Sequence, residues 1–406
     1  MRVCGVYFVF VILLSACTNG VSHLDIALQQ AKHNKAELEK VLKHFKHDSL
    51  KYRAACFLIE NMPGKYSILP YDSLDRYKNF LKIIPQNDPI SWDVRYSKIW
   101  HGFDSISKRQ LAGFSKIEDI KVITGDYLIK NIEYSFKIWE NGKIKDYCSF
   151  DEFCHYILPY RIDHEPLSDW REEGFQKFGH LLDSLMSPRE LALRIIKLGG
   201  MRYNIGMTKY PYKQSYAEML QTRWGTCDDM AAFLALSLRA IGIPASIDYV
   251  PAWANRSSSH CWNVVKDATG DFIEVGYGPE GKNEVVYKIS KIYRKKYDIP
   301  LCDVTSEYAM PLSDLTFRVP SQKDKQLISL CTFNNHDWVP VALSKVMNGS
   351  VLFESVGRGI LWGDNQIRTY LNEGKGIVFL AFISQKGRLN NKPIGFPVIL
   401  LEDGKK

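Results

Sequence analysis

Two residues of this chain have the types and the local settings that a cysteine-based reaction needs. Cys227 lies in the run Trp-Gly-Thr-Cys-Asp-Asp, at the start of a segment with helical character that stops at Gly242. His260 follows in Ser-His-Cys-Trp-Asn. A thiol is an effective nucleophile only as thiolate, and the free N–H groups and dipole of a helix N-terminus lower its pKa. A histidine within reach could accept the thiol proton, so the pair predicts nucleophilic catalysis.

The neighbouring elements would hold this pair in place. Thr226 is predicted to cap the helix, and Gly225 to let the chain turn tightly before it. Strands are predicted over residues 245–250, 260–265 and 271–275. A cysteine on a helix, then a histidine on a strand, then an acid on the next strand has the layout of a papain-like triad.

The motifs together resemble the transglutaminase-like superfamily. The similar stretches are Gly225–Cys227, Leu238–Ala245 and His260–Trp262, and the resemblance extends over about residues 185 to 300. It implies a papain-like α+β core in which Cys227 attacks an amide carbonyl and His260 carries the proton. The N–H of Cys227 is then the expected oxyanion donor.

The resemblance leaves two kinds of function open. Bacterial relatives of this core are more often hydrolytic, as peptidases or amidases, than transamidating. The expected substrate is therefore an amide in a peptide, a protein or the cell wall. The alternative is a catalytically inactive lipoprotein that keeps the fold and binds peptide or glycan.

The acid of the triad departs from the family pattern. Members carry an aspartate at the end of the strand after the histidine strand, and that position here is Gly276. If the intervening turn centres near residue 268, Glu274 lies opposite Trp262 and shares a face with His260. We therefore expect the Glu274 carboxylate to lie within hydrogen-bond reach of the imidazole. The alternative is that Glu274 is a solvated strand residue with no role in the site. The residues to consider after it are Asn263, Asp271 and Glu280.

Further site residues follow from a looser resemblance. The whole chain is similar to bacterial envelope lipoproteins that carry this core between two other domains, and in them a block like residues 150–161 recurs. On that basis Arg161 is predicted to contact a substrate carboxylate or amide. Trp224 and Trp262, close to the cysteine and the histidine in sequence, are predicted as further substrate contacts. The remaining cysteines of the core and its flanks are interpreted as packing residues: Cys56, Cys154, Cys261, Cys302 and Cys331.

The chain begins with a segment typical of a bacterial lipoprotein. One positive charge, a short apolar run and small residues precede Cys17 in Leu-Ser-Ala-Cys, which resembles a lipobox. Residues 1–16 are predicted to be a signal peptide and Cys17 the lipid-bearing residue, with an ordinary signal peptide as the alternative. Because no aspartate follows Cys17, we expect a lipid-anchored protein of the cell envelope, at the outer membrane of a Gram-negative bacterium.

Composition and periodicity indicate several packed domains. The chain has 406 residues, of which 46% are hydrophobic and 13% aromatic. Residues 17–184 are predicted to form a mainly helical domain, 185–300 the transglutaminase-like core and 301–406 an antiparallel β-sandwich. Helices are predicted within 24–61, 73–84, 120–141, 150–158 and 188–196, and sandwich strands over 327–333, 338–343, 350–353 and 376–382.

The distribution of charged residues argues against nucleic acid and metal ions as partners. The net charge of +8 is spread along the chain without the aromatic interleaving of a nucleic-acid surface. His44 and His47 could share a helix face, but their lysine-rich surroundings indicate a solvated face. We expect no metal, no cofactor and no nucleic acid, and a membrane contact made through the lipid anchor.

Overall fold

The protein has an α+β fold, seen here in a computed structural model. It describes residues 22–68, 116–141, 143–183, 185–203, 213–283, 287–299, 301–319, 324–334, 337–358, 376–385, 388–401 and 403–405. The predicted signal peptide, Cys17 and the helix predicted at 73–84 lie outside these residues. Among the residues described, no helix has the length and apolar character to cross a bilayer.

The N-terminal region is mainly helical, as its periodicity predicts. Its helices are α1 (His23–Gln30), α2 (Lys35–His44), α3 (Ser49–Glu60), α6 (Gly125–Asn141) and α7 (Phe150–Tyr156). Their apolar faces meet in one cluster, in which Leu38, Leu58 and Phe153 are fully buried. A short antiparallel pair, β1 (Tyr66–Ile68) and β2 (Lys116–Glu118), belongs to the same region.

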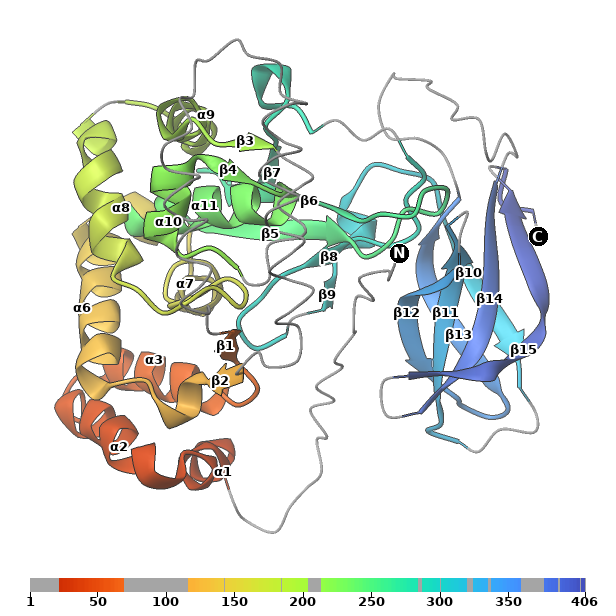
Figure 1. Ribbon diagram of the computed structural model, residues 1–406, viewed down its shortest axis with the longest axis horizontal. Coiled ribbons are helices and arrows are strands. Elements are labelled where there is room, and N and C mark those ends of the chain that lie inside the picture. The colour runs from red at the N-terminus through yellow and green to blue at the C-terminus, as the bar shows by residue number, and fades with distance from the viewer. Residues whose placement is uncertain are drawn as a thin grey trace, which may run out of the picture.

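A sheet covered by helices forms the core (Figure 1). The helices are α8 (Trp170–Phe178), α9 (Pro188–Gly199), α10 (Tyr216–Thr222) and α11 (Cys227–Ala240). The antiparallel sheet has the order β7 (Phe272–Val275), β6 (His260–Lys266), β5 (Ala245–Val250), β8 (Tyr293–Arg294) and β9 (Cys302–Asp303). Every residue of α11 from Asp229 onward is buried, as expected for a helix that is apolar almost all round. Trp170 and Phe178 belong to the same buried cluster as α11.

Two short strands lead into the core helix. β3 (Arg202–Tyr203) pairs in parallel with β4 (Trp224–Gly225), the strand directly before α11. The start of the helix is therefore tied to the chain that follows α9.

The two faces of the five-stranded sheet pack against different groups. Cys261 and Val265 face the cluster around α11, whereas Trp262 and Val264 belong to a separate cluster on the opposite face. This alternation is the ordinary consequence of strand geometry.

The predicted register of β6 with β7 is wrong by two residues. Glu274 pairs with Val264 instead of Trp262, so the turn centres near residue 269. The Asp267 carboxylate causes the difference, because its Oδ1 accepts hydrogen bonds from the N–H groups of Thr269 and Asp271, at 2.9 and 3.1 Å. An offset of two residues keeps Glu274 on the predicted face but moves it along the strand.

The C-terminal region is an antiparallel β-sandwich. One sheet has the order β12 (Trp338–Lys345), β11 (Leu327–Phe333), β14 (Gly376–Gln385) and β15 (Arg388–Leu401). The other pairs β10 (Leu312–Arg318) with β13 (Ser350–Gly357). Leu315 and Phe353 of one sheet share a core with Leu330 and Phe379 of the other. The four predicted strands are present, and β10 and β15 were not predicted.

The sandwich lies beside the core (Figure 1), and buried side chains fasten the two together. The Lys291 ammonium donates to the carbonyl oxygen of Glu354 at 2.9 Å, and the Tyr293 hydroxyl to that of Val341 at 2.8 Å. Ala254, in the loop between β5 and β6, belongs to the hydrophobic core of the sandwich. The loop that precedes His260 is therefore held by both units.

Candidate active site

Cys227 is the first residue of α11, and a capping box fixes this helix end. The N–H and hydroxyl of Thr226 each donate to Asp229 Oδ2 at 2.9 Å, and the Asp229 N–H donates back to Thr226 Oγ1 at 3.4 Å. Gly225 approaches this cap so closely that a Cβ would lie 2.5 Å from Asp229 Cβ. The glycine is therefore required for close packing. Among the described residues the N–H groups of Cys227 and Asp228 meet no acceptor, so both are free to bind an oxyanion.

His260 opens β6 with its ring between two tryptophans. The ring centroids of Trp253 and Trp262 lie 5.7 and 5.9 Å from that of His260. Its Nε2 forms a hydrogen bond of 3.0 Å with Asn283 Oδ1. The imidazole also interacts with the Cys227 side chain, and this interaction raises the pKa of His260. Since Nε2 is occupied by Asn283, Nδ1 is the nitrogen left to face the thiol.

Mutual hydrogen bonding shifts the two groups toward their charged forms. A hydrogen bond from Cys261, together with the hydrogen bond and charge of His260, lowers the pKa of Cys227 to about 5, against the opposing effects of burial and Asp228. Burial alone would lower the pKa of His260, but its hydrogen bonds with Cys227 and Asn283 raise it above the ordinary value. Between these two pKa values the proton sits on the imidazole. In that pH range the pair is a thiolate and an imidazolium.

Asn283 occupies the space beside the position where the family carries its aspartate. A Cβ on Gly276 would lie 2.8 Å from Asn283 Cα and 2.5 Å from the carbonyl oxygen of Lys282. The turn between them is closed by a 2.9 Å hydrogen bond from the Gly276 N–H to the Gly281 carbonyl. Because residue 276 has no side chain, the chain folds back against the strand end and delivers Asn283 to His260. This residue was not predicted, although the turn at Gly278-Pro-Glu-Gly, two residues after Gly276, was a usable signal.

The predicted contact between Glu274 and His260 is absent. Glu274 lies opposite Val264, four residues from His260 along β6, which is roughly 13 Å at about 3.3 Å per residue. Burial raises the pKa of Glu274 to about 8, whereas its interaction with the Asn283 side chain acts in the opposite direction. Among the described residues Asn283 Nδ2 is buried and has no hydrogen bond of ordinary length. Glu274 therefore lies near Asn283 without forming a hydrogen bond of ordinary length with its Nδ2.

The residues considered after Glu274 lie elsewhere. Asn263 donates its amide hydrogen to the Ala231 carbonyl in α11, at 2.7 Å. Asp271 belongs to the exposed turn between β6 and β7, and the Glu280 side chain is 80% exposed. None of the three forms a hydrogen bond with His260.

Arg161 cannot contact a substrate, so this prediction is corrected. The residue is 4% exposed. Its Nε and Nη2 lie 2.6 and 2.7 Å from the Asp119 carboxylate, and Nη1 donates to the carbonyl oxygens of Tyr66 and Asp163 at 2.8 and 3.0 Å. The protein itself occupies the guanidinium, which anchors the chain at Asp163.

The two tryptophans predicted to contact substrate are buried. Trp224 is 7% and Trp262 2% exposed, which leaves little surface for a ligand. The Trp262 indole donates to the Tyr308 hydroxyl at 2.9 Å, and Tyr308 donates to Asp248 at 2.5 Å. Trp262 therefore supports the His260 ring from within the core.

Cys261 does more than pack. It is buried in the cluster around α11, as its interpretation as a packing residue requires. Its S–H donates to Asp228 Oδ1 at 3.4 Å, and its side chain also interacts with that of Cys227. The seven described cysteines are all free thiols, and burial raises the pKa of Cys56 and of Cys302.

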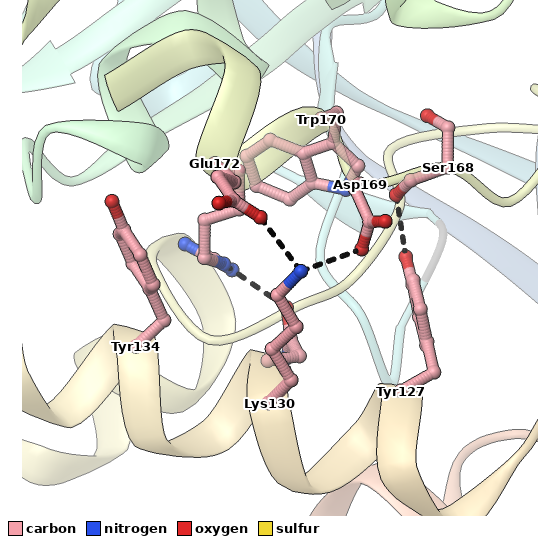
Figure 2. Close-up of a pocket in the computed structure, with 9 residues that line it drawn as sticks. Tyr127, Lys130, Tyr134, Ser168, Asp169, Trp170 and Glu172 are labelled. Atoms are coloured by element: carbon pink, nitrogen blue, oxygen red, sulfur yellow. Dashed lines mark hydrogen bonds and ion pairs between the residues drawn. The ribbon is translucent and has the colours of Figure 1, made fainter. Parts of the chain in front are cut away.

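A small pocket lies away from this pair, between α6 and the start of α8 (Figure 2). Lys130 crosses it and donates to Glu172 at 2.7 Å and to Asp169 at 3.3 Å. Its volume of about 20 Å³ holds little more than one water molecule. Neither Cys227 nor His260 lines it. No group of three or more metal-binding side chains is gathered in the described part of the chain.

Comparison with known proteins places the pair inside a recognised domain. The family model of the transglutaminase-like superfamily matches residues 180–276, a range that includes Cys227 and His260 and stops short of Asn283. No curated protein matches the chain. A solved structure of a candidate cysteine protease from Cytophaga hutchinsonii is similar at 12% identity and a TM-score of 0.22. That alignment covers 56% of this chain and 53% of the other, about half its length.

Proposed function

We propose that this chain, whose residues 180–276 form a domain of the transglutaminase-like superfamily, is a cysteine enzyme that attacks amide bonds. The observation that carries the proposal is the line of contacts from Cys227 to His260 to Asn283. Nucleophile, base and orienting group are then present in the order that a cysteine hydrolase requires.

The contacts define a role for each group. The Cys227 thiolate would add to the amide carbonyl, and the resulting oxyanion would accept a hydrogen bond from the Cys227 N–H. The His260 imidazolium would give its proton to the leaving amine, which leaves a thioester on Cys227. Asn283 would hold the ring so that Nδ1 faces the sulfur. Water, deprotonated by His260, would then release the acid.

We favour hydrolysis over transamidation, and the bacterial relatives of this core support that choice. Both reactions share the thioester and differ only in whether water or an amine attacks it. Incubation of a cleavable peptide amide with excess primary amine separates them. The free acid is the expected product, and accumulation of the amine adduct would assign the transamidase reaction instead.

Labelling with an amide-like electrophile tests the enzyme proposal directly. A peptide chloromethyl ketone should alkylate Cys227 near pH 6, where Cys56 and Cys302 remain protonated thiols. Mapping the modified peptide by mass spectrometry identifies the site, and Cys227→Ala provides the control. Slow labelling, equal at all cysteines, would favour a binding protein over an enzyme.

We also propose that the protein is anchored in the cell envelope, and the sequence around Cys17 supports this location. Leu-Ser-Ala-Cys follows an apolar run, as in lipoproteins processed at that cysteine. In a bacterial host, palmitate label should enter the wild-type chain and not Cys17→Ser, which should leave the membrane fraction. A membrane-bound and unlabelled wild type would contradict the lipid anchor.

A further inference from the structure

Four charged side chains gather next to the nucleophile. Lys213 Nζ lies 3.5 Å from Asp228 Oδ2 and 3.8 Å from Asp163 Oδ2, and Lys295 Nζ lies 3.1 Å from the same Asp163 oxygen. Asp163 follows α7, Lys213 precedes α10, Asp228 lies on α11, and Lys295 follows β8. Four separate segments therefore converge beside Cys227. We call these residues the charged cluster.

The charged cluster is close to the reacting sulfur. Asp228 directly follows Cys227, and the Cys261 thiol, 3.4 Å from Asp228 Oδ1, also forms a hydrogen bond with Cys227. The side chains of Lys213 and Asp228 are 31% and 44% exposed. A group held by the cluster would therefore be near an amide positioned for attack and in contact with solvent.

Lys213 is the member of the charged cluster whose ion pairs leave room for a closer partner. Both of its ion-pair distances exceed the ordinary range for an N–H···O hydrogen bond, about 2.7–3.2 Å. It donates no hydrogen bond to any residue that the structure describes. Burial works against its charge, but Asp228 and Asp163 raise the pKa of Lys213, so it remains an ammonium. A partly exposed cation with three donors suits an incoming carboxylate.

The two carboxylates hold this lysine without saturating it. Asp163 is fixed through its backbone, because its N–H donates to Glu165 at 2.7 Å and its carbonyl accepts from Arg161. The Asp163 carboxylate is engaged by Lys295 at 3.1 Å. The buried Arg161 therefore fixes the backbone at Asp163, and this holds the Asp163 carboxylate in place beside the two lysines.

We propose that Lys213 binds a carboxylate of the substrate next to the scissile amide, so that the enzyme acts on acidic peptides. The inference rests on the proposed function and adds the substrate class to it. The charged cluster would select the substrate, and the contacts from Cys227 to Asn283 would supply the chemistry. Lys213 is thus a specificity residue, whose loss should change binding and leave the chemistry intact.

Two peptide chloromethyl ketones, identical except for Glu or Gln beside the reactive carbon, test this assignment. The second-order rate of Cys227 alkylation is measured for each by mass spectrometry, and the rate with free glutathione corrects for intrinsic reactivity. The wild type should prefer the Glu probe by about 10-fold, which corresponds to about 1.4 kcal/mol, because the Gln probe lacks the charged hydrogen-bond acceptor. The preference should shrink as salt rises.

Variants separate this inference from the enzyme proposal. Lys213→Met should abolish the preference with little effect on the Gln probe, and Lys213→Arg should retain it. Lys282→Met is the matched control, because that lysine is 74% exposed and pairs with Glu280 outside the charged cluster. Equal alkylation by both probes in the wild type would overturn the carboxylate site and leave the enzyme intact. Failure of both probes to alkylate Cys227 would overturn the proposed function.

Discussion

At the residue scale, this site orients its histidine with an amide, whereas the transglutaminase-like pattern places a carboxylate there. Asn283 Oδ1 accepts a hydrogen bond from His260 Nε2, which selects the tautomer that offers Nδ1 to Cys227. A neutral amide adds no charge to stabilise the imidazolium. The neighbouring thiol of Cys261, followed by the His260 imidazole, therefore lowers the pKa of Cys227 to about 5.

Removal of the amide should slow the reaction more than removal of the nearby acid. Asn283→Ala should lower kcat by roughly 10- to 100-fold, part of the 10²–10⁴-fold that acid–base catalysis contributes. Glu274→Gln should change kcat less than about 3-fold, because a group whose pKa is about 8 is already largely protonated at pH 7. Glu280→Gln, on an exposed side chain, is the control. A larger loss of kcat in Glu274→Gln than in Asn283→Ala would instead make Glu274 the third member of the triad.

The thiolate can be followed through its pH dependence. Alkylation of Cys227 by iodoacetamide should rise to half its maximum near pH 5 and stay high at alkaline pH, because only the thiolate reacts. Peptide cleavage should share the acid limb but fall again as His260 loses its proton, above its ordinary pKa of about 6.5. In His260→Ala the alkylation midpoint should move toward about 8.5, the value of a free cysteine. An unchanged midpoint would mean that the histidine does not activate the thiol.

At the element scale, the parts with a strong local signal were predictable. The helix that begins at Cys227 and the strand at His260 follow from apolar periodicity, a cap and Gly242. The register of β7 was not predictable, because the side chain of Asp267 decides where the turn closes. Strand β15 was also missed, since Pro393, Gly395 and Pro397 argue against a strand in any local reading. Asn283 is brought in by a close backbone contact at Gly276, which no periodicity encodes.

The cap of α11 should contribute to both stability and reactivity. Thr226→Ala removes the acceptor for the Asp229 N–H and the hydroxyl that donates to its carboxylate. Loss of an N-cap costs about 1 kcal/mol in the free energy of unfolding, which urea denaturation would measure. The helix start should also fray, so the iodoacetamide midpoint of Cys227 should rise. Ser149→Ala, which removes an equivalent capping box from α7, is the matched control and should leave that midpoint unchanged.

At the scale of the whole molecule, the sandwich is joined to the α+β core near His260. Its core includes Ala252 and Ala254 from the loop that leads into β6, the same loop that carries Trp253 against the imidazole. The sheet that presents His260 also contains Tyr293, which donates to the sandwich. We therefore expect the C-terminal unit to support the geometry of the site in addition to any binding role.

This coupling can be broken at one close backbone contact. A Cβ on Gly357 would lie 2.1 Å from the Ile289 carbonyl oxygen, so Gly357→Ala must push β13 away from the core. The wild type should unfold in one calorimetric transition, whereas the variant should show two as the sandwich uncouples. Its Cys227 should also be alkylated more slowly near pH 6, because the loop with Trp253 would loosen beside His260. Glu354→Ala, on an exposed side chain of the same strand, should change neither measurement. A single transition with unchanged alkylation in Gly357→Ala would show that the two units fold as one body and that the site is insensitive to their junction.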